Sequence, residues 1–340
     1  MESSSSPASA APGLPVRNAA RVAFFLSGFV TAAWAPLVPF AKARLQLDEA
    51  TLGLLLLCLG AGSLASMSVA ASLTARFGCK KIIIVSGTTA CAALPLLALA
   101  PTFALLAGSL LLFGAAMGIL DVAQNIHATQ VQKLSGKAMM SGFHGMYSVG
   151  GFAGAGGASL MLLWGLTPVA AAAIVSCLAL LLLACWGRHL IHESTTGREP
   201  AFAVPRGIVL VLGVLCFIMF LAEGAMLDWS AVLLSTRGVA LSDAGIGYSL
   251  FAIAMTFGRF IGDRLVRGLG GPAVLRLGSV SAAAGFALAV AVPLPAAGFA
   301  GCVLIGLGAS HIVPVLFTEA GNQAVMPMPL AIAATSLFGH

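Results

Sequence analysis

The sequence predicts an all-α membrane protein that crosses the bilayer many times. Of its 340 residues, 59% are hydrophobic and only 8% are charged, whereas soluble domains average about 25% charged residues. Its apolar runs approach the length of about 20 residues that a helix needs to cross a bilayer. They are apolar on every face, unlike the alternating strands of about ten residues in a β-barrel. These observations exclude soluble enzymes, disordered proteins and fibres.

Windows of about 20 residues divide the chain into ten spans. Segment 1–16 is rich in Ser, Ala and Pro and is expected to be a disordered cytoplasmic tail. An N-terminal six-helix bundle is expected over 17–187, a cytoplasmic linker with two prolines over 188–206, and an incomplete C-terminal bundle over 207–340. The spans are expected at 20–40, 51–73, 82–100, 103–124, 139–163, 167–187, 207–227, 244–262, 274–292 and 296–317. The segment after span ten is about half the length of a span, so an eleventh helix is expected to be partial.

The distribution of positive charge predicts the orientation. If the N-terminus is cytoplasmic, 14 of the 17 Lys and Arg residues lie on the cytoplasmic side, as the positive-inside rule requires. Only Lys42, Arg44 and Arg237 lie on the other side. We therefore expect a multi-pass protein of the cell's inner membrane with a cytoplasmic N-terminus.

Two pairs of segments suggest an internal repeat. LDEATLGLL and TARFGCKK flank the second span, and LSDAGIGYS and GDRLVRGLGG flank the eighth. Each pair begins with an acidic helix-start signal and ends in a basic cytoplasmic turn, although the spacing differs. Parallel six-helix repeats are the layout of one large class of transporters.

These turns, together with the two-bundle layout, resemble the major facilitator superfamily. The segments DVAQNIHA, SGFHGMYSVGGFAGA, AEGAMLDWSAVLL and IVPVLF resemble its fucose-permease-like bacterial branch. The resemblance implies twelve helices, of which this chain holds ten and a partial eleventh, so we expect it to be truncated. It also implies an aspartate in the first cytoplasmic turn, where this chain has Ala75.

Ionisable and strongly polar residues inside the predicted spans are few. A charge at the bilayer centre costs about 2.5 to 3.5 kcal/mol, so these residues are expected to face a cavity or a partner. The candidates for a solute or proton pathway are Asp121, Asn125, His144, Glu223 and His311. They lie in spans four, five, seven and ten, and the resemblance implies that spans one, four, seven and ten surround a central cavity.

Asp121 and Asn125 share one helix face because they are four residues apart. His144 is expected at a similar depth, and a histidine beside a carboxylate can pass a proton onward. The alternative interpretation is a buried polar network that fixes helix packing. Glu223 suits a polar or cationic solute, or is a helix-end carboxylate reached by water. For His311, which precedes Pro314, packing and function are both open.

The resemblance implies that the cytoplasmic turns form a gate, and its candidate residues are Arg76, Gly78, Lys80, Asp263 and Arg264. For Asp263 and Arg264 we expect a role in holding the cytoplasmic side closed. For the first turn, which lacks the aspartate, we expect the basic residues to determine topology only.

The leading hypothesis is a secondary transporter that moves a small solute by alternating access, coupled to protons. The alternatives are a non-transporting remnant of such a transporter and, more distantly, a membrane-embedded enzyme using His144 and Ser148. The seven cysteines show no metal-site spacing, so we expect no metal and no cofactor. The expected partners are the solute, protons and the lipid bilayer, with no nucleic acid, and a monomer is expected.

Overall fold

The computed structural model describes residues 13–191, 205–240, 243 and 245–338. Most of the expected tail (1–16) and of the expected linker (188–206) lies outside the described residues. The first helix begins at Leu14, within the segment expected to be a tail.

The described residues form helices joined by short turns and loops, and contain no strand. The N-terminal half comprises α1 (Leu14–Ala33), the short 3₁₀ helix η1 (Ala35–Leu37), α2 (Val38–Leu45), α3 (Glu49–Phe77), α4 (Cys79–Leu99), α5 (Phe103–Ser135), α6 (Met140–Leu163) and α7 (Pro168–Gly187). The C-terminal half comprises α8 (Ile208–Thr236), α9 (Ile246–Leu269), α10 (Gly271–Ala291), α11 (Pro295–Ala309), α12 (Ile312–Asn322) and α13 (Met328–Phe338).

By length and composition, nine helical segments among the described residues are able to cross a membrane. Two of them combine neighbouring helices, Leu14–Leu45 and Pro295–Asn322. Helix α9 is of similar length, 24 residues, but carries Arg259 in its interior. The chain is therefore an all-α polytopic membrane protein, as its composition predicts.

Local sequence signals explain where several helices begin and end. The side chain of Asp48 accepts a hydrogen bond from the Thr51 amide at 2.7 Å and so caps α3. Thr102 caps α5 and Thr167 caps α7 in the same way. Span ten is interrupted between α11 and α12, just before Pro314, because a proline has no N–H to donate to the preceding turn.

Two glycine turns reveal the internal repeat in the backbone. Gly78 joins α3 to α4 with φ 81° and ψ 148°, and Gly270 joins α9 to α10 with φ 81° and ψ 154°. Such positive φ values favour glycine because it has no Cβ. The helices after these turns, α4 and α10, each contain 21 residues. The two halves thus share a helix–turn–helix unit, although their flanking sequences differ in spacing.

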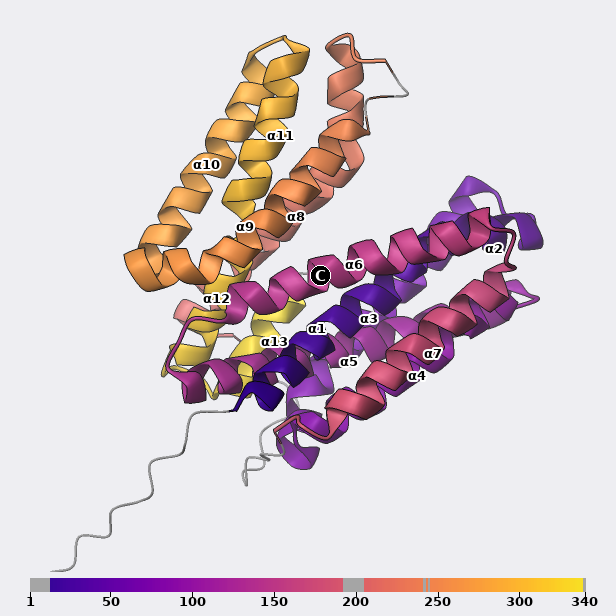
Figure 1. The fold of residues 1–340 in the computed structure, drawn as a ribbon, viewed down its shortest axis with the longest axis horizontal. Helices are drawn as coiled ribbons and strands as arrows, with labels where there is room; N and C mark the ends of the chain where they lie inside the picture. Colours follow the sequence, from indigo (N-terminus) through magenta and orange to yellow (C-terminus); the bar gives the residue numbers. More distant parts are fainter. Residues whose placement is uncertain (1–12, 192–204, 241–242, 244, 339–340) are drawn as a thin grey trace, which may run out of the picture.

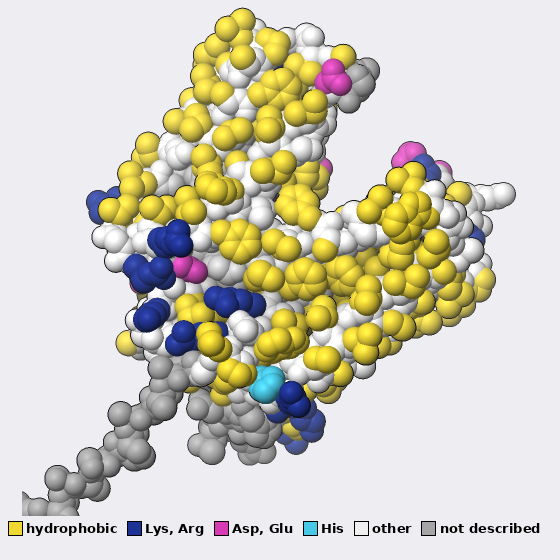
Figure 2. Space-filling model, viewed as in Figure 1, with side chains coloured by type: hydrophobic (Ala, Val, Ile, Leu, Met, Phe, Trp, Pro, Cys, Tyr) yellow, Lys and Arg dark blue, Asp and Glu magenta, His cyan; other side chains and the backbone are white. Residues whose placement is uncertain are grey.

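The two halves form a V (Figure 1). At one end α8, α10 and α11 diverge from α2 and the end of α6, and the space-filling view shows an open cleft between them (Figure 2). At the other end the halves meet, with α6 against α9 and α12 against α5 and α6. The N-terminus of α1 lies at this closed end.

Helix α13, which corresponds to the expected partial eleventh span, packs between the two halves. It contacts α3 and α5 of the first half and α8 and α12 of the second. Its residues from Pro329 to Ser336 are all buried. This short helix therefore forms part of the wall that joins the halves.

Candidate functional site

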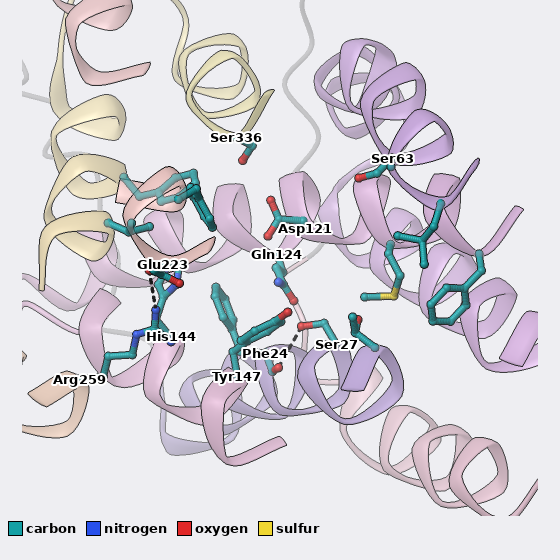
Figure 3. A pocket seen from close by; sticks show the side chains of 18 residues that line it. Phe24, Ser27, Ser63, Asp121, Gln124, His144, Tyr147, Glu223, Arg259 and Ser336 are labelled. Atoms are coloured by element: carbon teal, nitrogen blue, oxygen red, sulfur yellow. Dashed lines mark hydrogen bonds and ion pairs between the residues drawn. The ribbon is translucent and has the colours of Figure 1, made fainter. Parts of the chain in front are cut away.

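A cavity of about 270 Å³ lies between the two halves, near the middle of the helices. Helices from both halves line it, including α1, α3, α5 and α6 on one side and α8, α9, α12 and α13 on the other. Its polar side chains, most of them labelled in Figure 3, are Ser27, Thr31, Ser63, Asp121, Gln124, His144, Tyr147, Glu223, Arg259 and Ser336. Aromatic rings, including Phe24, Phe113, Phe220 and Phe317, complete the wall.

An ion pair lies in the wall of this cavity. The Glu223 carboxylate on α8 lies 3.7 Å from the Arg259 guanidinium on α9 (Figure 3). Arg259 also donates to the Ser148 hydroxyl of α6 at 2.6 Å. Glu223 is thus linked through Arg259 to the other half of the molecule. Only 10% of the Arg259 side chain is exposed. Because burial removes most of its hydration, these two partners stabilise its positive charge.

Arg259 is the main residue that sequence reasoning placed wrongly. The positive-inside count assigned it to the cytoplasmic side because the predicted span ended at 262. Helix α9 continues to Leu269, so Arg259 lies in its interior. Its position four residues before Asp263, one turn further into the helix, is the signal that could have identified it.

Asp121 and Asn125 lie one turn apart on α5, as their spacing predicts. The Asn125 amide donates to the Asp121 carboxylate at 3.1 Å and to its backbone oxygen at 3.0 Å. Asp121 lines the cavity, whereas Asn125 is fully buried and does not. Asn125 therefore positions Asp121 and does not itself face the cavity.

His144 lies between two aromatic rings in the cavity wall. Its ring centroid is 5.2 Å from that of Phe24 on α1 and 5.7 Å from that of Phe317 on α12. It shares the cavity with Asp121 and Glu223. The hydroxyl of Ser148 donates to the backbone oxygen of His144 at 3.4 Å, so this hydrogen bond does not use the imidazole as a base.

His311 does not line the main cavity. It stands at the break between α11 and α12, is 7% exposed, and lines a second cavity of about 50 Å³. That cavity also includes Asp263 and Ser141. The structure therefore groups His311 with the closed end and leaves Glu223 with the central cavity.

Asp263 connects the two halves at the closed end. Its carboxylate accepts hydrogen bonds from the backbone amides of Ser141 at 3.0 Å and Gly142 at 2.9 Å. These amides belong to the first turn of α6, whose N–H groups have no partner within the helix. An acidic residue of the second half thus caps a helix of the first.

Gln132 on α5 strengthens the same junction and was not predicted. Its side-chain oxygen accepts from the amides of Met139 and Met140 at 2.8 and 2.9 Å, and its nitrogen donates to Thr318 of α12 at 3.0 Å. Arg267 of α9 donates to the Ala138 oxygen at 3.1 Å. The side chains of Gln132, Thr318 and Arg267 therefore hold α5, the start of α6, α9 and α12 together.

The other predicted gate residues lie elsewhere at this end. Arg264 lines a surface cavity beside Asp263. Arg76 lies over the Phe77 ring at 5.0 Å, and Lys80 donates to the Arg188 backbone oxygen at 2.8 Å, so both have contacts within the first half. Gly78 forms the α3–α4 turn described above.

Two half-bundles with matching turns enclose a polar cavity in a polytopic membrane protein. Comparison with known proteins gives the family. The chain belongs to the Major Facilitator Superfamily, whose family model matches residues 22–338.

Similar proteins agree with this assignment. The chain is 52% identical over 331 residues to an uncharacterized MFS-type transporter of Yersinia pestis, covering 97% of this chain and 86% of that protein. Its fold matches the proton:xylose symporter XylE with a TM-score of 0.74 at 14% identity, covering 95% and 85% of the two chains. It also matches FucP in its outward conformation with a TM-score of 0.64 at 16% identity, covering 95% of each chain.

Proposed function

We propose that the protein is a secondary active transporter that carries a small polar solute by alternating access and couples this movement to protons. The observation that carries the proposal is the central cavity, to which the first half contributes Asp121 and His144 and the second half Glu223 and Arg259. A site shared by two halves can be exposed to either side when one half rocks against the other.

The charged groups suggest how protons take part. With histidine neutral, Asp121, Glu223 and Arg259 give the cavity one excess negative charge. Burying a charged carboxylate without a partner is costly. When the Arg259 guanidinium moves away from Glu223, protonation of the Glu223 carboxylate is therefore favoured. A solute that competes for Arg259 would therefore couple its own binding to uptake of a proton.

The lining favours a solute with several hydroxyl groups. Serine and threonine hydroxyls and the Gln124 amide offer hydrogen bonds, and aromatic rings offer flat apolar surfaces. This lining supports proton-driven uptake of a sugar-like solute, in line with the resemblance to the fucose-permease-like branch. Asn125 and His311 act in this proposal as supporting residues, the first behind Asp121 and the second at the gate.

The charge distribution supports an orientation in the inner membrane in which the closed end faces the cytoplasm. Basic residues gather at the closed end, where the N-terminus of α1 lies (Figure 2), and the positive-inside rule assigns that side to the cytoplasm. The V then opens outward. Asp263 and Arg264 would hold the cytoplasmic gate closed, and a monomer would suffice because both halves are in one chain.

Reconstituted vesicles test this proposal. A thermal-shift screen of sugars, sugar acids and amphipathic cations first finds a ligand, because ligand binding stabilises the folded protein. Uptake of that ligand should increase with an inward proton gradient and move protons detected by an internal pH dye. Asp121→Asn and Glu223→Gln should lose this coupling, while Asp228→Asn, an exposed carboxylate outside the cavity, should retain it. Unchanged coupling in both cavity variants would contradict the proposal.

A further inference from the structure

The surface cavity beside Asp263, of about 260 Å³, lies at the closed end and is strongly basic. Five cationic side chains line it, together with one acidic residue: Arg17, Arg21, Lys137, Arg264, Arg267 and Asp263. They come from α1, the turn between α5 and α6, and α9, so both halves of the molecule contribute. Figure 2 shows this end as a cluster of Lys and Arg around an acidic side chain, next to an apolar surface.

Among the described residues that line this cavity, Asp263 offsets only part of the positive charge of the five cations. None of the five cations has a carboxylate partner there within ion-pair distance. Arg21 donates to the side-chain oxygen of Asn18 and Arg267 to the backbone oxygen of Ala138, both neutral acceptors. The Nε atom of Arg17 is buried and has no hydrogen-bond partner among the described residues. Both carboxylate oxygens of Asp263 accept from α6 amides.

An apolar strip begins at the edge of the cavity. Phe260 lines the cavity, and Phe257 and Ile253 lie one and two turns further along α9 toward the membrane centre. Their exposed fractions are 47%, 60% and 59%. Spacings of three and four residues place them on one helix face. A molecule that fits both features has an anionic head and an apolar chain.

We propose that this cavity binds the phosphate group of an anionic phospholipid, with an acyl chain along the α9 strip. Basic clusters at the ends of membrane helices attract anionic headgroups, and basic pockets between helices bind them specifically. A free phosphate would satisfy the cations but not the apolar strip. Because the lipid contacts both halves where the V is closed, its binding stabilises the closed end.

Native mass spectrometry of the purified full-length chain tests the proposal by comparing phosphatidylglycerol with phosphatidylcholine of the same acyl chains. The wild type should retain phosphatidylglycerol preferentially. Arg17→Gln with Arg21→Gln should weaken this retention roughly twenty-five-fold, since each basic side chain near an anionic surface contributes about a fivefold factor. Lys81→Gln with Arg276→Gln removes two exposed charges at the same end but outside the cavity, and should retain wild-type binding.

Three results would overturn the proposal. Equal retention of the two lipids by the wild type would show that the charge has no effect. An equal loss in the Lys81 and Arg276 control would show that only net charge matters. Displacement of the lipid by glycerol phosphate at equal concentration would identify a soluble phosphate as the ligand. If the Arg17 and Arg21 variant does not fold, Lys137→Gln with Arg267→Gln gives the same test.

Discussion

At the scale of single residues, the ion pair between Glu223 and Arg259 joins two helices in the wall of the central cavity. The two side chains lie on α8 and α9 and approach to 3.7 Å, and Arg259 then contacts Ser148 across the interface. Removing one member of a buried pair leaves the other charge without a partner, which is more costly than removing both.

A double-mutant cycle tests this ion pair. Arg259→Gln should destabilise the protein by about 3 kcal/mol, near the lower end of the range for broken buried pairs. The double variant Arg259→Gln with Glu223→Gln should recover part of this loss, because it leaves no unpaired charge. Thermal unfolding in detergent provides the measurement. Additive losses from the two single variants would show that the pair is not coupled.

The sequence predicts part of the cavity at this scale. Asp121, His144 and Glu223 can be selected because ionisable residues in apolar spans are rare, and all three line one cavity. Arg259 was missed because a hydropathy window cannot distinguish a buried arginine near a span end from one in water. His311 was not separated from Glu223, since sequence gives depth only approximately and does not show the break before Pro314.

At the scale of helices, glycines set how closely α1 approaches α6. A Cβ added at Gly154 would lie 2.0 Å from the backbone oxygen of Phe29, and one at Gly150 would lie 2.0 Å from that of Phe25. Small residues at such crossings allow close backbone packing in membranes. By contrast, a Cβ at Gly156 on the same helix would meet nothing within 4 Å.

These two environments predict opposite effects of the same substitution. Gly154→Ala should lower the stability by about 1 to 3 kcal/mol because the helices must separate. Gly156→Ala should leave it unchanged or raise it by up to about 1 kcal/mol, because alanine favours a helix more than glycine does. Melting curves in detergent compare the two variants. A loss at Gly156 equal to that at Gly154 would contradict close packing as the cause.

The cap that Asp263 provides for α6 predicts a change in the gate. Asp263→Asn removes the charge that faces two amides of the first turn, so the closed end should open more often. A cysteine at Ser141, in a chain whose native cysteines are replaced, should then react several-fold faster with a water-soluble maleimide. Asp243→Asn, at an exposed site before α9, serves as the control. Equal labelling rates in all three proteins would count against the cap as a gate.

Helix lengths show where sequence patterns become insufficient. The fourth span was expected to end at 124, but α5 continues to Ser135. The added turns contain Asn125, His127 and Gln132, which are polar yet buried between helices. Hydropathy depends on the side chain and not on its surroundings. The predicted span therefore ends at 124, because the next turns of the helix contain polar side chains that are nevertheless buried. The glycine turns at 78 and 270, in contrast, lie in the predicted basic turns.

At the scale of the whole molecule, the sequence predicts an all-α membrane fold but not its conformational state. Composition and span length are sufficient to predict the fold class. In lipid the backbone must satisfy its own hydrogen bonds, so long apolar segments form helices. Which end is closed depends on contacts between distant residues, such as Gln132 with Thr318. No periodic pattern in the chain encodes these contacts, so only the structure reveals a V that is closed near the N-terminus of α1.

Distances between spin labels on the two halves test alternating access most directly. One pair, at Trp164 and Leu294, lies on exposed helix ends at the open side, and the other, at Arg76 and Arg276, on exposed sites at the closed side. We expect acidification or an added solute to shorten the first distance while it lengthens the second. Distances that remain fixed, or that change together in one direction, would contradict a transporter whose halves rock around the central cavity.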